Sequence, residues 1–309
     1  MTSLSARLTR LLLRACTYPL RRRHASLSRS VQLKDGGFRP PHGFTLRTEF
    51  WGGVRTEVLL PPRAQGALLH FHGGGHTQPM NDMYRRIALR YAQLTGRAVF
   101  SPCYTAGEDK TYPSVHDECF AAYRAFAARC GMENTVAAGD SFGANLLLSA
   151  CLRAREAGLP LPQAIACISP YIDLAASGDS YRRNCHKDPL YALPQGESFA
   201  EYEQYIRRRT PYIGGADARD ALLSPAYADY DRFPPVLIVY GSLETSASDG
   251  EMLAARLRAA GRTAYERPYE GMWHDFLYLT PFLPESRRAW IEIASFLRED
   301  GAGKEPDIS

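Results

Sequence analysis

A serine between two glycines stands at a predicted strand-to-helix turn. Residues 139–143 read Gly-Asp-Ser-Phe-Gly, follow the apolar run 135–138 and precede the helical run 144–150. Glycines on both sides let the backbone turn sharply, which would expose the Ser141 hydroxyl as a nucleophile. The positive end of the following helix dipole would lie where an anion forms during attack on a carbonyl. An ordinary turn rich in glycine and serine is the structural alternative.

Three consecutive glycines follow another apolar run. Residues 72–75 read His-Gly-Gly-Gly, directly after the run 67–71. Successive glycines can turn their backbone amides toward one point, as the binding of an oxyanion requires. A flexible turn is one alternative, and a metal site made by His70, His72 and His76 is another. No carboxylate or cysteine lies close by in the sequence to complete such a site, so we expect no metal.

A serine nucleophile needs a base, and the base needs an acid that orients it. His274 stands just after the last strand candidate, which is where the chain order serine, acid, histidine requires a base. The acid is expected after the apolar run 236–240, and Glu244 lies in the loop 241–245 that follows. Asp249, a few residues further on, is the competing candidate for the acid.

Short apolar runs alternate with helical patterns along most of the chain. This alternation predicts a mostly parallel sheet with helices on both faces, since buried parallel strands are continuously apolar. Two shorter strands, at 45–49 and 55–60, are expected before this alternation begins. The further expected strands are 67–71, 98–101, 135–138, 164–168 and 236–240, and the expected helices are 82–95, 115–130, 143–157, 249–260 and 285–298.

One stretch interrupts this alternation. Residues 177–230 lie between two predicted strands and are too long for a plain connection. An insertion at the carboxyl ends of a parallel sheet is the usual position of a lid or cap. The stretch carries the basic triplet 207–209 and the tyrosines at 181, 191, 202, 205, 212, 227 and 230.

The composition is that of an ordinary globular protein. The chain has 309 residues, of which 45% are hydrophobic and 23% charged, with a net charge of +4, so disorder is not expected. No apolar run is long enough for a membrane span. The seven cysteines are an odd number without a CxxC pair. They argue against a disulfide scaffold or a zinc module and favour a reducing, cytoplasmic location.

The first 50 residues are basic, with Asp35 and Glu49 as their only acids. Leucines at helical spacing and arginines on other faces predict an amphipathic helix. A helix folded onto the protein is the plainest interpretation; a targeting peptide and a membrane-surface helix are alternatives. The basic residues are not interleaved with aromatics and the rest of the chain has no basic excess, so we expect no nucleic-acid partner.

Taken together, these motifs resemble the hormone-sensitive-lipase-like branch of the α/β-hydrolases, a group that includes small bacterial esterases. The likeness extends over roughly residues 45–299 in the right order. The matching pieces are 72–75, 139–143, 168–174 (Ile-Ser-Pro-Tyr-Ile-Asp-Leu), 223–229 (Leu-Ser-Pro-Ala-Tyr-Ala-Asp), the pair 234–235 (Pro-Pro) with Glu244, and 271–274 (Gly-Met-Trp-His).

The resemblance implies a role for each matching residue. Ser141 would be the nucleophile, His274 the base and Glu244 the orienting acid. The amides of Gly74, Gly75 and Phe142 would form the oxyanion hole, with His72 and Gly73 supporting that loop. No metal or organic cofactor is implied, and a homodimer is compatible with the family. These roles are carried by Ser141, Glu244, His274, Gly74, Gly75, Phe142, His72 and Gly73.

The resemblance also implies a division of the chain. Residues 45–176 and 231–300 would form the α/β-hydrolase core. Residues 1–44 would be a helical segment that packs with the insertion 177–230 as a cap, and residues 301–309 would be a flexible tail. The segment that starts at Arg21-Arg22-Arg23 looks like a cap helix.

Three departures from the family pattern bear on the site. The family usually has alanine where this chain has Phe142, whose ring would narrow the acyl side of the pocket. In the stretch 103–109 the chain has Cys103 and Thr105 where the family carries aspartate and arginine, and the acid is Glu244 where the family more often has aspartate. We expect a serine carboxylesterase for small, short-chain esters. An amidase or deacetylase for an acetylated compound, or a non-catalytic small-molecule binder, are the alternatives.

Overall fold

The computed structural model describes residues 2–22, 35–193, 197–200 and 211–301. Its centre is an eight-stranded sheet whose strands are β1 Thr45–Trp51, β2 Val54–Leu60, β3 Ala67–Phe71, β4 Ala98–Pro102, β5 Thr135–Asp140, β6 Ile165–Ile168, β7 Val236–Gly241 and β8 Ala264–Tyr269. The strand order is β1-β2-β4-β3-β5-β6-β7-β8. The pairs β1–β2 and β2–β4 are antiparallel, and all later pairs are parallel.

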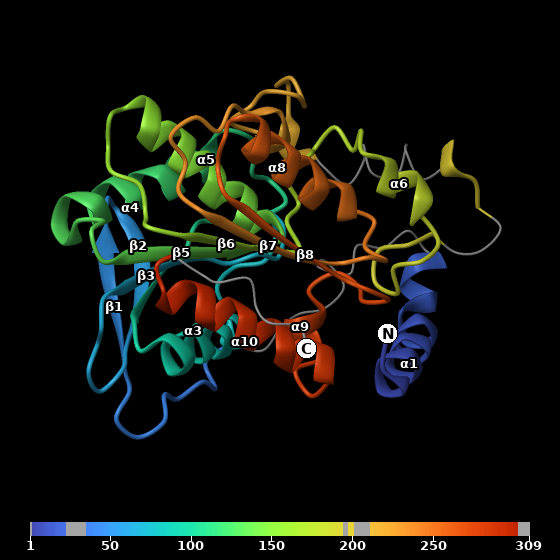
Figure 1. Ribbon diagram of the computed structural model, residues 1–309, viewed down its shortest axis with the longest axis horizontal. Coiled ribbons are helices and arrows are strands. Elements are labelled where there is room, and N and C mark those ends of the chain that lie inside the picture. The colour runs from blue at the N-terminus through green and yellow to red at the C-terminus, as the bar shows by residue number, and fades with distance from the viewer. Residues whose placement is uncertain (1, 23–34, 194–196, 201–210, 302–309) are drawn as a thin grey trace.

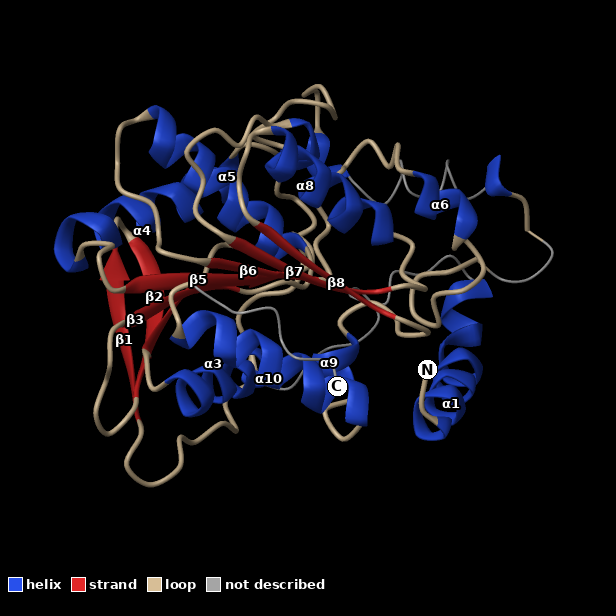
Figure 2. Cartoon of the chain, in the orientation of Figure 1, coloured by secondary structure: helices blue, strands red, loops and turns tan. Residues whose placement is uncertain are grey.

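Helices cover both faces of this sheet, as Figures 1 and 2 show. One layer consists of α4 Ser114–Cys130, α5 Phe142–Glu156 and α8 Ala247–Ala259. The other consists of α3 Asp82–Thr95, α9 Phe276–Leu279 and α10 Pro284–Arg298. Each layer contributes to its own buried apolar cluster against the sheet. Strands β5, β6 and β7 are buried along their whole length, as strands covered on both faces must be. The predicted α/β class with a mostly parallel sheet is confirmed.

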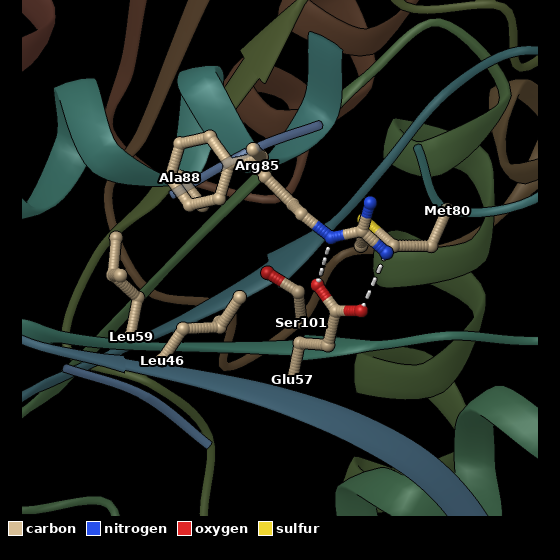
Figure 3. A pocket seen from close by; sticks show the side chains of 8 residues that line it. Leu46, Glu57, Leu59, Met80, Arg85, Ala88 and Ser101 are labelled. Atoms are coloured by element: carbon tan, nitrogen blue, oxygen red, sulfur yellow. Dashed lines mark hydrogen bonds and ion pairs between the residues drawn. The ribbon is translucent and has the colours of Figure 1, made fainter. Parts of the chain in front are cut away.

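A buried ion pair fixes α3 against strand β2 (Figure 3). The Arg85 guanidinium donates from Nε to Glu57 Oε2 at 2.7 Å and from Nη2 to Glu57 Oε1 at 2.8 Å. It also donates to Asp82 at 2.9 Å and to Asp35. Such a two-point contact has a fixed geometry, so it sets the position of α3 relative to β2. The pair therefore holds the helix that supplies Tyr84 to the candidate site.

The N-terminal residues form α1 Leu4–Arg22, which contacts both the insertion and the core. The Thr17 hydroxyl donates to the carbonyl oxygen of Pro189, which belongs to the insertion. The Thr2 hydroxyl donates to the Glu270 carbonyl oxygen at 2.8 Å. Figure 1 shows α1 beyond the end of the sheet, on the same side as the insertion's α6 Asp179–Arg183. Among the helices that the structure describes, none is long and apolar enough to cross a membrane.

Some sequence-based expectations fall on residues outside the described ranges. Arg21 and Arg22 end α1, but Arg23 and the expected cap helix after it lie outside. The same holds for Tyr202, Tyr205 and the basic triplet 207–209, and for the tail from residue 302. The described parts of the insertion include α6 and the 3₁₀ turns Pro211–Ile213 and Pro225–Tyr227.

Candidate active site

Ser141 occupies a sharp turn between β5 and α5. Its φ of 50° and ψ of −122° are rarely adopted by a residue with a side chain. The flanking glycines are required by close packing. A Cβ on Gly139 would lie 2.7 Å from the Gly143 carbonyl oxygen, and a Cβ on Gly143 would lie 2.2 Å from the Phe71 carbonyl oxygen. The Gly-x-Ser-x-Gly pattern is thus explained by the tight contact of this turn with itself and with β3.

Ser141, His274 and Glu244 form a continuous line of hydrogen bonds. Ser141 Oγ lies 2.9 Å from His274 Nε2, and His274 Nδ1 lies 3.0 Å from Glu244 Oε2. The three residues follow β5, β8 and β7 respectively, so the carboxyl ends of neighbouring parallel strands bring them together. All three side chains are buried. The arrangement allows the imidazole to take the serine proton while the carboxylate stabilises the resulting charge.

The two candidate acids have different partners. Glu244 Oε1 accepts hydrogen bonds from the Ser169 hydroxyl at 2.8 Å and from the Gly241 amide, which leaves Oε2 for His274. Asp249 lies on α8, where its Oδ2 accepts from the amides of Ile172 at 2.7 Å and Asp173 at 2.9 Å. Of the two, the structure brings only Glu244 to His274.

Two more carboxyl groups surround His274. Asp275 Oδ2 lies 3.4 Å from His274 Nε2, and Asp188 Oδ2 accepts from the His274 amide at 3.4 Å. Burial alone would lower the pKa of His274, but the charges of Asp275, Glu244 and Asp188 outweigh burial and raise the pKa to about 10. Burial also raises the pKa of Asp188 to about 6, since it disfavours the charged carboxylate. The surroundings of His274 therefore favour its protonated form.

The glycine loop after β3 is held from beneath by aromatic side chains. Gly74 and Gly75 have φ values of 90° and 64°, which glycine adopts without strain. The Tyr104 hydroxyl lies 2.9 Å from the His72 carbonyl oxygen and 3.0 Å from that of Gly73. It thus fixes the backbone just before the two glycines.

The imidazole of His72 lies between two tyrosine rings. Its centroid is 4.2 Å from that of Tyr104 and 4.7 Å from that of Tyr84. Burial lowers the pKa of His72 to about 3, despite the hydrogen bond to the Gly73 carbonyl oxygen. The ring is therefore neutral, and its Nδ1 donates to that oxygen at 2.9 Å. The contacts of His72 are thus with the glycine loop and the two tyrosines.

A cluster of aromatic rings includes Phe142, the residue after Ser141. The Phe142 ring packs edge-on against Tyr212 at 5.3 Å and against His116 at 6.0 Å. The His76 ring stacks on Tyr212 at 5.2 Å. His116 is itself fixed by the Tyr212 hydroxyl at 2.8 Å and by Asn145 Oδ1 at 3.0 Å. Because Tyr212 belongs to the insertion, this wall joins the insertion to the nucleophile turn.

The three histidines that raised the question of a metal site have separate surroundings. His70 Nδ1 lies 3.1 Å from the Ser101 hydroxyl, His72 bonds the glycine loop and His76 stacks on Tyr212. Within the described ranges, no three or more His, Cys, Asp or Glu side chains are grouped so as to hold a metal ion.

Sequence reasoning missed several residues that shape the site. Ser169 and Tyr104 lie in stretches compared with the family, but their hydrogen bonds link segments far apart in the chain. Asp188 lies 86 residues from His274, so no local pattern connects them. Asp275 directly follows His274 in the sequence. An acidic residue beside the candidate base is the local signal that could have indicated its contact with the imidazole.

Comparisons with known proteins agree with this fold. A protein-family model described as alpha/beta hydrolase fold matches residues 68–278. An acetyl-hydrolase of Streptomyces hygroscopicus is 33% identical to the chain over 250 residues, which cover 80% of this chain and 80% of that relative. An esterase of Acinetobacter venetianus is 28% identical over 246 residues, covering 79% of this chain and 78% of the relative.

Solved structures give the same result. A hormone-sensitive lipase from a metagenome library superposes with a TM-score of 0.81 at 28% identity, covering 96% of this chain and 98% of that one. An esterase from the bacterial hormone-sensitive lipase family superposes with a TM-score of 0.75 at 28% identity, covering 89% and 88%.

Proposed function

We propose that this chain, which belongs to the α/β-hydrolase fold family, is a carboxylic ester hydrolase that forms an acyl-enzyme on Ser141. The hydrogen-bonded line from Ser141 through His274 to Glu244 carries the proposal, with distances of 2.9 Å and 3.0 Å. Similarity to esterases in sequence and in structure supports the same reaction class. The resemblance of the sequence motifs to the hormone-sensitive-lipase-like branch agrees with the similarity to a solved hormone-sensitive lipase.

The reaction proceeds in two acyl-transfer steps. Ser141 Oγ attacks the ester carbonyl carbon while His274 Nε2 takes its proton, and Glu244 stabilises the imidazolium. The tetrahedral intermediate collapses, the C–O bond to the alcohol breaks, and His274 returns the proton to the leaving alkoxide. Water then attacks the acyl-enzyme with His274 again as base. The acid is released and the Ser141 hydroxyl is restored.

The amides of Gly74, Gly75 and Phe142 bind the oxyanion in this mechanism. Positive φ values at both glycines and the helix that begins at Phe142 support this assignment. Tyr104 and the neutral ring of His72 hold the loop in position from beneath. Position 73 of the loop requires a glycine, because a Cβ on Gly73 would lie 2.2 Å from Asp140 Oδ2.

The substrates are esters with a short acyl group. Phe142 directly follows Ser141, and its ring packs against Tyr212, on which His76 stacks; these rings would limit the length of the acyl chain. Residues 1–44 and the insertion 177–230 act as a cap over the core, which comprises 45–176 and 231–300. Two contacts support the cap: Thr17 of α1 bonds Pro189, and the Tyr191 ring packs edge-on against His274 at 5.0 Å.

Removal of an acetyl group from a larger molecule is the second candidate. The relative at 33% identity over 80% of the chain is named an acetyl-hydrolase, and a small acyl site fits an acetyl group. The leaving group would then be a larger alcohol or amine under the cap. We also propose a reducing, cytoplasmic compartment, since each of the seven cysteines is a free thiol.

Hydrolysis of p-nitrophenyl esters from acetate to dodecanoate tests the function. The proposal expects the highest kcat/KM at short chains and a loss of about 10³-fold or more in Ser141→Ala. Ser149→Ala is the matched control, because it removes another buried hydroxyl from α5. A fluorophosphonate should label the wild type and the control but not Ser141→Ala.

Two results would count against this function. Equal rates in the wild type and Ser141→Ala would exclude Ser141 as the nucleophile. Absence of hydrolysis together with absence of fluorophosphonate labelling would favour a non-catalytic binder of small molecules.

A further inference from the structure

Helix α1 turns four of its leucines away from the rest of the protein. Leu4, Leu8, Leu11 and Leu12 are 71%, 54%, 60% and 67% exposed. The side that faces the protein carries Ala6 and Thr17, which are buried, and Leu13, which packs against the core. At about 100° per residue these two stripes lie on opposite sides of the helix. The more apolar stripe of α1 is thus the one that faces solvent.

Arginines flank the leucine stripe along one side. Arg7, Arg10 and Arg14 follow one another on this flank of the helix, and α1 contains no Asp or Glu. A helix with an apolar stripe and an arginine-rich border has the character of helices that lie in the interface of a bilayer. Arginines of this kind attract anionic lipid headgroups.

We propose that α1 is a membrane-surface helix that binds reversibly to anionic bilayers, with its leucine stripe in the acyl–headgroup boundary. The charge favours this partner over a second copy of the helix. A second α1 would bring more arginines and no acid to pair with them, whereas an anionic bilayer supplies both an apolar layer and negative charge.

The position of α1 also relates the helix to the candidate active site. Thr17 bonds Pro189, and two residues further on the Tyr191 ring contacts His274. Helix α1 lies beyond the end of the sheet, next to the insertion (Figure 1). Attachment through its outer stripe would therefore bring the cap side of the molecule to the lipid surface, while the leucines remain clear of the core.

Co-sedimentation of the full chain with lipid vesicles tests this inference. We compare phosphatidylcholine vesicles with vesicles that also contain about 30% phosphatidylglycerol. We expect the chain to bind the anionic vesicles about tenfold or more tightly than the neutral ones. Binding to the anionic vesicles should also weaken in about 0.5 M salt. Binding does not depend on hydrolysis, so its failure would be separate from a failure of the proposed esterase function.

Two pairs of substitutions distinguish the helix from the rest of the surface. Leu8→Ser with Leu11→Ser should lower binding to anionic vesicles by about tenfold or more. Phe282→Ser with Ile291→Ser is the matched control, because these side chains are 59% and 66% exposed but lie outside α1. The control should bind as the wild type does. Melting curves by circular dichroism confirm that each variant is folded.

Other results would overturn the proposal. Equal binding by the Leu8–Leu11 variant and the wild type would exclude the helix as the lipid contact. Equal affinity for neutral and anionic vesicles would exclude the role of the arginines. A wild type that is dimeric by light scattering and leaves vesicles unbound, with a monomeric Leu8–Leu11 variant, would assign the stripe to a second copy of the chain.

Discussion

The Asp275 carboxylate lies 3.4 Å from His274 Nε2, the same ring nitrogen that lies 2.9 Å from the Ser141 hydroxyl. Burial raises the pKa of Asp275 well above its ordinary range, while the positive charge of His274 lowers it. The carboxylate form of Asp275 is therefore favoured beside a protonated His274, and in that form it opposes removal of the proton from His274. The Asp275 amide donates to Ser169 Oγ at 2.9 Å, and Ser169 donates to Glu244. The backbone next to the base is therefore tied to the acid by one serine.

Replacing Asp275 should change the pH dependence of hydrolysis. His274 acts as a base only when neutral, and its raised pKa moves the rise of activity toward alkaline pH. Asp275→Asn removes the carboxylate that, when ionised, contributes most to raising this pKa. We expect the rising limb of kcat/KM to move to lower pH by about one unit or more. The measurement is a pH profile from about pH 6 to pH 10.

Asp231→Asn is the control for that experiment, since its carboxylate is exposed at the surface. This variant should give the wild-type profile. An unchanged or alkaline-shifted limb in Asp275→Asn would contradict the assigned role of Asp275.

Protonation of His274 should also contribute to folding stability. Its pKa in the folded protein is about 10, against an ordinary value of 6.5, so the folded state holds the proton more tightly. This contribution is complete below pH 6.5 and is lost as pH rises toward 10. We expect the unfolding free energy of the wild type, relative to His274→Gln, to fall by roughly 1–4 kcal/mol across this range. Urea unfolding of both proteins at several pH values measures this difference. A difference in unfolding free energy that stays constant with pH would contradict the prediction.

The two candidate acids should respond differently to neutral replacements. Glu244→Gln removes the charge that faces His274 Nδ1 at 3.0 Å, so kcat should fall by about 10³-fold. The Asp249 carboxyl contacts other residues than His274. Its Oδ2 accepts from the Ile172 and Asp173 amides, as an asparagine oxygen also can. Asp249→Asn should keep kcat within about twofold. Steady-state kinetics on p-nitrophenyl acetate measure both, and the reverse order would make Asp249 the acid.

The Tyr104 hydroxyl should matter for catalysis more than for binding. Tyr104→Phe leaves the His72 and Gly73 carbonyl oxygens without this contact and loosens the glycine loop. We expect a loss of about tenfold in kcat with little change in KM. Tyr91→Phe is the control, because it removes a buried hydroxyl that contacts Tyr278 at 2.7 Å. Both should lose about 1 kcal/mol of stability, and an equal loss of kcat in both would mean a general loosening.

The Phe142 ring should limit acyl chain length. Phe142→Ala opens the wall that it forms with Tyr212 while keeping the backbone amide. The kcat/KM for octanoate relative to acetate should rise by about tenfold. Phe233→Ala is the matched control, since this buried ring packs against Tyr230 and Arg155. The idea fails if the octanoate-to-acetate ratio changes equally in both variants.

Elements with a clear local signal could be predicted residue by residue. Strand β3 matches its apolar run 67–71, and α3 matches the helical pattern 82–95, which Asn81 caps and Gly96 ends. A strand was expected shortly before His274 but without a range, because β8 is an edge strand. It is partly exposed and includes Glu266, Arg267 and Pro268, so it lacks a continuous apolar run.

The residues of the candidate site could likewise be predicted only where they depend on local sequence. The turn around Ser141 depends on glycines at fixed spacing, which the sequence displays. The contact of Asp188 with His274 depends on how the insertion folds back, which no periodicity encodes. The leucines of α1 illustrate the same limit, because the pattern predicts a helix but not which stripe the protein covers.

The backbone at Ser141 has a consequence for laboratory evolution. A φ of 50° is a conformation that glycine adopts freely and serine only with strain, at a cost of order 1 kcal/mol. A selection that rewards heat resistance alone would therefore enrich Ser141→Gly and return a sturdier, inactive protein. Rounds of thermostabilisation on this scaffold need a turnover screen, because the proposed nucleophile is the residue that selection for stability alone would replace.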